Sequence, residues 1–274
     1  MLSLSASART GTLLEKQKEE SEKMTAKDIA LKNEILRGVV GSTAHGTAVD
    51  GQDDRDEMGV FIEPQENVCG LTPLDHYIYR DAAEGQRSRP GDLDLTMYSL
   101  RKFCRLAAQG NPSIICLLWL PEYEFKTDLG QRLIDLRDAF ISRESGQRFL
   151  GYLVAQRMKM TGERTQTVKR TDLLEKYGYD TKFAMHALRL GYQGIQLMTE
   201  WKLTLPAPEP YLSELRAVRT GQVSFQQALS MINAAENALR IFVDNCERVA
   251  DIAKINAFMA QTHQEYWWRH PANA

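Results

Sequence analysis

The sequence predicts an α+β fold, α/β-like in its first half, in which a small mixed sheet with flanking helices is followed by a helical C-terminal region. Three short segments with strand character, at 35–40, 55–63 and 92–98, all lie before residue 125. From there to the end, apolar residues recur at helical spacing. The chain has 274 residues, of which 43% are hydrophobic and 26% charged, so it is long enough for one or two globular domains.

The first expected element is a solvated helix at 12–35, a stretch rich in Glu, Lys and Ala with no interior Gly or Pro. A change to strand-like character follows it at once. We therefore expect three parts, namely an N-terminal helix at 1–34, a sheet-containing domain at 35–125, and a helical domain at 126–274 that closes one side of a cleft.

Each of the three strand candidates has its own evidence. The apolar run at 35–40 ends in a glycine-serine turn, which is typical of a strand that turns tightly into a helix. The segment 55–63 is stopped by Pro64, and 92–98 alternates polar and apolar residues with period two. This last strand leads into a helical stretch closed by Gly110.

The second half is expected to be built from helices. Residues 146–160 and 180–200 have helical periodicity, and 205–211, with three prolines, is an extended connection. Apolar residues from 225 to 253 follow one helical stripe, which predicts a single long amphipathic helix. This helix either packs against its own chain or forms a homodimer.

Composition limits the partners and the compartment. Thirty-four basic residues against 36 acidic ones give a net charge of −2, so any nucleic acid would have to meet a local basic patch, for which Lys169, Arg170, Lys182 and Arg189 are candidates. No apolar run is long enough for a transmembrane helix, and no secretory signal is evident. The four cysteines are widely spaced, which is typical of buried thiols in the cytoplasm.

The stretch from 41 to 60 combines a glycine-serine turn with paired carboxylates. Asp54 and Asp56 lie two residues apart at the predicted second strand, so their side chains point to the same face. Two carboxylates this close repel each other unless a cation lies between them, and Mg²⁺ suits such oxygen ligands, with Mn²⁺ as a substitute. Gly41 and Ser42 open the following helix, where backbone N–H groups favour a phosphate.

A third carboxylate would complete a site for two metal ions. The predicted strand at 92–98 offers Asp94, with Asp92 in reserve, because both fall on one face of that strand. Taken singly, each feature has an ordinary explanation, because glycine-serine turns cap helices and neighbouring aspartates form solvated loops. Their conjunction in one strand-turn-helix-strand arrangement favours a site for a metal-bound nucleotide.

These residues resemble the DNA polymerase beta superfamily of nucleotidyltransferases. More narrowly, GSTAHGT, DDRDEMGV, DLDLTMYSLRKF, GNPS and YDTKFAMHALRL are similar to the RNA-ligase-associated nucleotidyltransferases of bacteria and phages, over roughly residues 36–200. The resemblance implies that Gly41 and Ser42 grip a nucleoside triphosphate and that Asp54 and Asp56 bind two Mg²⁺ ions. It implies further that Asp94 binds the catalytic metal and helps to deprotonate an acceptor hydroxyl.

The chain departs from the superfamily pattern at one point. The spacing from the glycine to the first aspartate is one residue longer than usual, with Gly51 and Gln52 as the site of the insertion, so Asp53 competes in the count. Asp54 and Asp56 are preferred because the strand follows directly.

Residues outside the acidic motif form weaker candidates. Lys182, His186 and Arg189 recur along one face of a helix, and we expect them to bind the nucleotide unless they form an exposed basic face. His45 either touches a phosphate or fixes the turn as a neutral histidine. The loops at 80–91 and 161–172 border the site or play no part in it, and Trp267 and Trp268 anchor packing or stack on a base.

The expected function is therefore Mg²⁺-dependent transfer of a nucleoside monophosphate from a nucleoside triphosphate such as ATP to an acceptor hydroxyl, with release of pyrophosphate. RNA, tRNA in particular, is the first candidate for the acceptor, and we expect the enzyme to work in the bacterial cytosol or the phage-infected cell. Two alternatives stay open: an AMP transferase that acts on a protein or small molecule, and a non-catalytic nucleotide-binding or interaction module.

Overall fold

The computed structural model describes residues 24–49, 54–83, 88–165 and 170–271. A five-stranded mixed sheet runs in the order β3-β4-β2-β1-β5, in which only β2 and β4 pair in parallel. The strands are β1 (Glu34–Val39), β2 (Arg55–Phe61), β3 (His76–Arg80), β4 (Leu93–Ser99) and β5 (Phe125–Lys126). The expected mixed sheet with flanking and C-terminal helices is confirmed.

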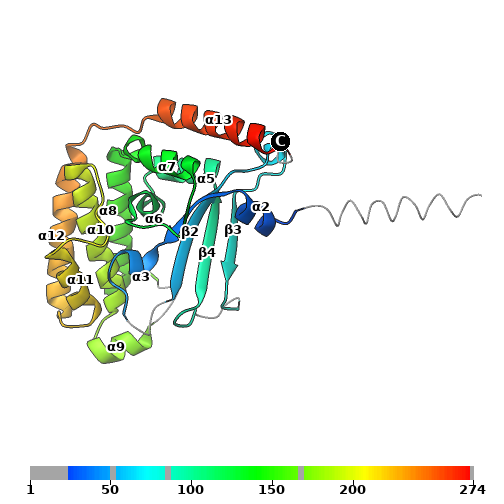
Figure 1. The fold of residues 1–274 in the computed structure, drawn as a ribbon. Coiled ribbons are helices and arrows are strands. Elements are labelled where there is room, and N and C mark those ends of the chain that lie inside the picture. The colour runs from blue at the N-terminus through cyan, green and yellow to red at the C-terminus, as the bar shows by residue number, and fades with distance from the viewer. Residues whose placement is uncertain (1–23, 50–53, 84–87, 166–169, 272–274) are drawn as a thin grey trace, which may run out of the picture.

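The helices lie mostly on one side of this sheet (Figure 1). Those of the first half are α2 (Ala26–Lys32), α3 (Gly41–Ala44), α4 (Gln65–Cys69), α5 (Leu100–Ala108), α6 (Pro112–Cys116), α7 (Asp128–Asp135) and two 3₁₀ turns, η1 (Leu117–Trp119) and η2 (Arg137–Phe140). Those of the second half are α8 (Arg143–Thr161), α9 (Thr171–Tyr177), α10 (Thr181–Glu200), α11 (Tyr211–Arg219), α12 (Phe225–Asp244) and α13 (Ile252–Arg269). None of the helices in the described ranges is long and apolar enough to cross a membrane.

The buried core divides by the two faces of the sheet. On one face, Met58 and Val60 belong to the main apolar cluster, which continues through α5 and the packed helices α8, α10 and α12. On the other face, Phe61 and Met97 form a small cluster that α2 covers through Ala30. Alternation along β2 thus points successive side chains to opposite layers, as the period-two pattern requires. The main cluster crosses residue 125, and the division of the chain at that point stays a prediction.

The strands and helices that frame the site lie close to where the sequence predicts them. Ser99 caps α5 by accepting a hydrogen bond from the Lys102 amide, and Asp180 caps α10 by accepting from the amides of Lys182 and Phe183. These caps fix the starts of the two helices. Of the helix expected at 12–35, only its last part lies in the described residues, as α2.

The prediction of a single long helix from 225 to 253 is wrong. Helix α12 ends at Asp244, with Asn245 as its C-cap, and a second helix, α13, begins only after Asp251. The intervening backbone bonds to other elements instead, because the Arg143 amide donates to the carbonyl of Arg248 and the Asp251 amide donates to that of Ala139. Tertiary hydrogen bonds therefore interrupt the stripe, and a homodimer through this region stays a prediction.

Further details of the structure go beyond the sequence analysis or differ from it. The sequence does not predict strand β3, and the apolar residues that follow Asn111 form α6 and η1. Cys69, at the end of the short helix α4, is exposed, whereas the other cysteines are buried and all four are free thiols. Trp267 is partly buried, and its indole N–H donates to the Glu63 carbonyl, while Trp268 is 88% exposed.

Candidate functional site

The three predicted aspartates come together at one edge of the parallel strand pair. Asp54 directly precedes β2, Asp56 is the second residue of β2, and Asp94 pairs with Asp56 in the parallel register of β2 and β4. One carboxylate oxygen from each lies within 4.8 Å of the others. Because like charges at this separation repel in a partly buried setting, the cluster favours a bound cation.

Gly41 makes room for this cluster. Its φ of +65° is in the left-handed region, and a Cβ atom there would lie 2.0 Å from Oδ2 of Asp56. The amide of the preceding Val40 donates to the Asp56 carbonyl, which holds the turn against β2. The glycine of the glycine-serine turn is thus required both by its backbone conformation and by the carboxylate beside it.

Asp94 is bound on one side only. Its Oδ2 accepts a hydrogen bond of 3.1 Å from the Ser88 hydroxyl and lies 3.8 Å from Nε of Arg80, whereas its Oδ1 is buried with no partner among the described residues. A buried carboxylate oxygen without a partner costs free energy of folding, and a bound metal ion would supply the missing partner. Three carboxylates with one orphan oxygen fit a hard divalent cation such as Mg²⁺.

Asp92, the reserve candidate, lies outside this cluster. It closes the turn before β4, where its Oδ2 accepts from the Arg89 amide at 2.7 Å. Asp53, together with Gly51 and Gln52, lies outside the described residues. Among the described carboxylates, the geometry therefore selects Asp54, Asp56 and Asp94.

A pocket of about 320 Å³ opens over two of these aspartates. The sheet and the glycine turn line it with Gly41, His45, Asp56 and Asp94, and α10 lines it with His186 and Arg189. The negative carboxylates thus share a pocket with a guanidinium that belongs to a separate helix. Such an arrangement can hold a metal ion and a polyanion together.

The surroundings of the two pocket histidines favour their uncharged form. Burial, followed by the positive charge of Arg189, lowers the pKa of His45 and that of His186 well below the ordinary value of 6.5. Burial also lowers the pKa of Arg189, for which the described parts of the chain provide no carboxylate partner. Of the three residues predicted on this face of α10, Arg189 therefore supplies the positive charge that lines the pocket.

The remaining predicted residues have other positions. Lys182 is partly exposed, one turn before His186, and is not among the residues that line the pocket. Ser42 lies in the turn beside Gly41, and its carbonyl accepts from the Thr47 amide. Arg170 pairs with the buried Asp180 at 3.1 Å, so it supports the start of α10 rather than an open basic patch, and Lys169 lies outside the described residues.

The sequence does not single out three residues of the site. Arg80, at the end of β3, and Ser88, in the β3–β4 connection, contact Asp94. Both belong to the loop at 80–91, which the sequence offers as a border of the site without naming these two residues. Gln193 bonds to both His45 and Arg189. Its one sequence signal is a position four residues after Arg189, which places it on the same face of the helix.

Comparison with known proteins identifies the family. The sequence matches the family model described as RlaP, RNA repair pathway DNA polymerase beta family, over residues 9–254. A similar solved structure is the nucleotidyltransferase-like protein from Exiguobacterium sibiricum 255-15, with 12% sequence identity, a TM-score of 0.29, and an alignment covering 88% of this chain and 77% of that chain. No curated protein matches the sequence. The family match spans well over half of the chain.

Proposed function

Because this chain belongs to the RNA repair pathway DNA polymerase beta family, we propose that it is a metal-dependent nucleotidyltransferase that modifies RNA. It would transfer a nucleoside monophosphate from a nucleoside triphosphate to a hydroxyl group of the RNA and release pyrophosphate. The free thiols of its four cysteines suit a reducing compartment, and we place its action in the cytoplasm.

One observation carries this proposal. Three carboxylates gather at the edge of β2 and β4, and the pocket over Asp56 and Asp94 is lined on its other side by Arg189. Carboxylates alone would repel a triphosphate, and an arginine alone would not hold a metal ion. Together they match a nucleotide whose phosphates carry divalent cations.

The residues of the chain divide the work by position. When bound, Mg²⁺ would neutralise the charge that develops on the phosphates during transfer. Asp54 and Asp56 would hold the metal, the turn at Gly41 and Ser42 would pack against the phosphates, and Arg189 and His186 would bind them from α10. Lys182, one turn earlier on α10, would contact a more distant part of the nucleotide.

Asp94 has the remaining role. The oxygen of the acceptor hydroxyl forms a bond to the α-phosphorus as the bond to the β-phosphate oxygen breaks, so pyrophosphate leaves with that electron pair. Asp94 would orient the hydroxyl and help to remove its proton. Its place in the carboxylate cluster and its unpartnered Oδ1 among the described residues support this assignment.

The decisive experiment compares Asp94→Asn with Asp92→Asn. Each protein is incubated with α-labelled nucleoside triphosphates and Mg²⁺, and with total RNA, cell protein or small metabolites as separate acceptors. We expect label in the RNA fraction, a loss of at least about a hundredfold for Asp94→Asn, and near wild-type transfer for Asp92→Asn.

Other outcomes would decide against the proposal. Label in the protein or metabolite fraction would identify an AMP transferase with a different acceptor. Nucleotide binding without transfer to any fraction would identify a binding module. Full activity of Asp94→Asn would remove the carboxylate cluster from the mechanism. Replacing Mg²⁺ by Mn²⁺ or by chelator in the same assay tests the metal.

A further inference from the structure

His45, Gln193 and Arg189 form a closed ring of three contacts at the wall of the pocket. Nη1 of Arg189 lies 3.1 Å from Oε1 of Gln193 and also contacts Nε2 of His45. Nε2 of Gln193 lies 3.1 Å from Nδ1 of His45, which closes the ring. Gln193 is only 4% exposed and His45 only 6%, so water has little access to these contacts.

This ring cannot satisfy all its contacts at once. Arg189 has only donors, the Gln193 carboxamide has one donor end and one acceptor end, and a neutral imidazole has one N–H and one acceptor. If Gln193 donates to Nδ1, then Nε2 of His45 carries the proton and faces the donor of Arg189. If the proton moves to Nδ1, or if the carboxamide turns over, another pair of donors meets. One contact of the three is always between two donors.

Arg189 is the member of the ring that an incoming anion would attract. The turn that carries His45 is fixed on both sides, because the His45 amide donates to the Gly41 carbonyl and Nε of Arg216 donates to the Gly46 carbonyl at 2.8 Å. Arg189 has no carboxylate partner in the described chain, and its Nε is buried with no hydrogen bond. A buried guanidinium without a counter-ion favours any anion that reaches it.

We propose that the ring is a phosphate-triggered switch in which Gln193 is a positioning residue. The inference rests on the proposed function, because it takes the phosphates of the nucleotide as the trigger. When a triphosphate enters, Arg189 leaves His45 for the phosphate. Gln193 then donates to Nδ1 of His45, so the proton of the imidazole lies on Nε2 and becomes a second donor to the phosphate.

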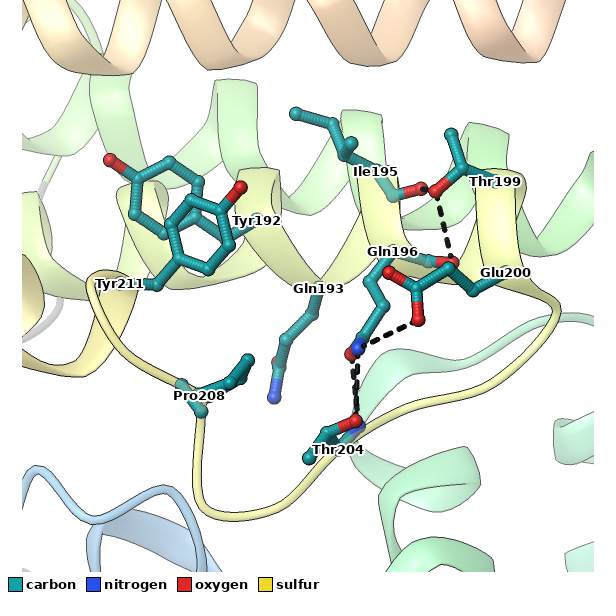
Figure 2. A pocket seen from close by; sticks show the side chains of 10 residues that line it. Tyr192, Gln193, Ile195, Gln196, Thr199, Glu200, Thr204, Pro208 and Tyr211 are labelled. Carbon is teal, nitrogen blue, oxygen red and sulfur yellow. Dashed lines mark hydrogen bonds between the residues drawn. The ribbon is translucent and has the colours of Figure 1, made fainter.

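Gln193 has space on its far side. A second pocket of about 220 Å³ lies farther along α10, between that helix and the connection to α11, and Gln193 lines it as well. In Figure 2 the Gln193 side chain points away from α10, between Pro208 and Gln196, which also line this pocket. The carboxamide can therefore adjust as Arg189 moves, without displacing packed side chains.

The substitution Gln193→Glu tests the switch with a change of nearly equal size. A carboxylate accepts from both Arg189 and the Nδ1 proton of His45, so it satisfies every contact of the ring and neutralises the arginine. We expect a higher melting temperature together with roughly tenfold weaker binding of inorganic tripolyphosphate in Mg²⁺. A merely structural role for Gln193 would lower the melting temperature instead.

Gln196→Glu is the matched control. Gln196 lies on the same helix, lines only the second pocket, and bonds to Thr204 rather than to the ring. It should bind tripolyphosphate as the wild type does. Equal binding by Gln193→Glu and wild type would overturn the switch and leave the proposed function in place.

A second measurement needs no variant. Nitrogen NMR of the wild-type imidazoles should show His45 with its proton on Nδ1 before ligand is added, because the charge-assisted contact from Arg189 is the stronger one. Tripolyphosphate should move the proton to Nε2. An unchanged tautomer in the phosphate-bound protein would overturn the proposal. A switch observed in a protein that transfers no nucleotide would instead overturn the proposed function alone.

Discussion

Gly41 decides how closely the glycine turn approaches the acidic cluster. Its missing side chain leaves the space that Oδ2 of Asp56 occupies, and its positive φ is a conformation that side chains rarely adopt. Neither property alone would single this residue out, because glycines at tight turns are common. Together they connect the backbone of the turn to the position of one carboxylate.

The substitution Gly41→Ala should therefore impair function more than stability. The added Cβ would force Asp56 out of the cluster, and we expect at least about a hundredfold loss of transfer with about 1–2 kcal/mol loss of unfolding free energy. Labelled-nucleotide transfer and urea unfolding measure the two effects. Gly91→Ala, at a positive φ with nothing within 4 Å, is the control for backbone strain. Equal transfer by the two variants would contradict the role of Gly41.

Among the residues of the site, the sequence predicts those whose position a local pattern fixes. Asp54 and Asp56 could be predicted because spacing by two along a strand fixes a shared face, and Asp94 because a polar residue recurs in an alternating strand. Gln193 could not be predicted. An amide that hydrogen-bonds across 148 residues of sequence leaves no periodicity and belongs to no motif.

At the scale of elements, β1 and β2 are joined by charge as well as by backbone hydrogen bonds. Glu57 is almost fully buried, and its two oxygens accept from Arg37 on β1 at 2.5 Å and from Arg55 on β2 at 2.7 Å. It also lines the pocket, one residue after Asp56. The pair of arginines thus stabilises the strand that carries the acidic cluster.

This arrangement predicts an acid-dependent stability. Burial acts to raise the pKa of Glu57, but the two arginines outweigh it and hold the pKa below the ordinary 4.5. The unfolded chain then binds the proton at higher pH than the folded chain does. The stabilisation is present above about pH 4.5 and is lost as the pH falls through the lowered pKa.

Glu57→Gln should remove this dependence. We expect it to be about 1–2 kcal/mol less stable than wild type near neutral pH, with a smaller difference by about pH 3. Urea unfolding at a series of pH values measures how the free energy of unfolding of each protein depends on pH. Glu124→Gln removes only the outer, exposed partner of Arg55 and should follow the wild-type curve. Parallel curves for wild type and Glu57→Gln would contradict the assignment.

Elements were predictable where the local pattern decides the outcome. The period-two run of β4 and the capped helix α10 appear close to their expected bounds. The break between α12 and α13 has no Gly or Pro to announce it, and it arises from hydrogen bonds to Arg143 and Ala139 that are distant in sequence. Strand β3 is mostly exposed at the sheet edge, so burial leaves little alternation to detect.

At the scale of the whole molecule, α13 returns the end of the chain to the sheet, across one end of the molecule in Figure 1. Buried polar contacts hold it there. Nε2 of His263 lies 3.0 Å from Oε2 of Glu63, and the Tyr266 hydroxyl donates to Asn33 at 3.0 Å. These contacts connect residues more than 190 positions apart. The last helix therefore holds the chain just before β1 and just after β2.

His263→Leu should therefore destabilise the molecule without altering its chemistry. Among the residues that the structure describes, it leaves the buried carboxylate of Glu63 with only the Arg101 amide as a donor, and we expect a loss of about 2–4 kcal/mol. The described residues that line the pocket include none from α13, so transfer per folded molecule should stay at the wild-type rate. Thermal unfolding and transfer well below the melting temperature measure the two effects.

Two companion variants separate the buried pair from the general loss of a helix contact. Trp268→Ala removes an exposed side chain from the same helix and should leave stability near that of wild type. Glu63→Leu combined with His263→Leu removes both polar partners and should regain part of the loss, since no unpaired charge is left in the core. Two outcomes would contradict a purely structural role for α13. One is equal stability of His263→Leu and Trp268→Ala, and the other is loss of nucleotide transfer by folded His263→Leu.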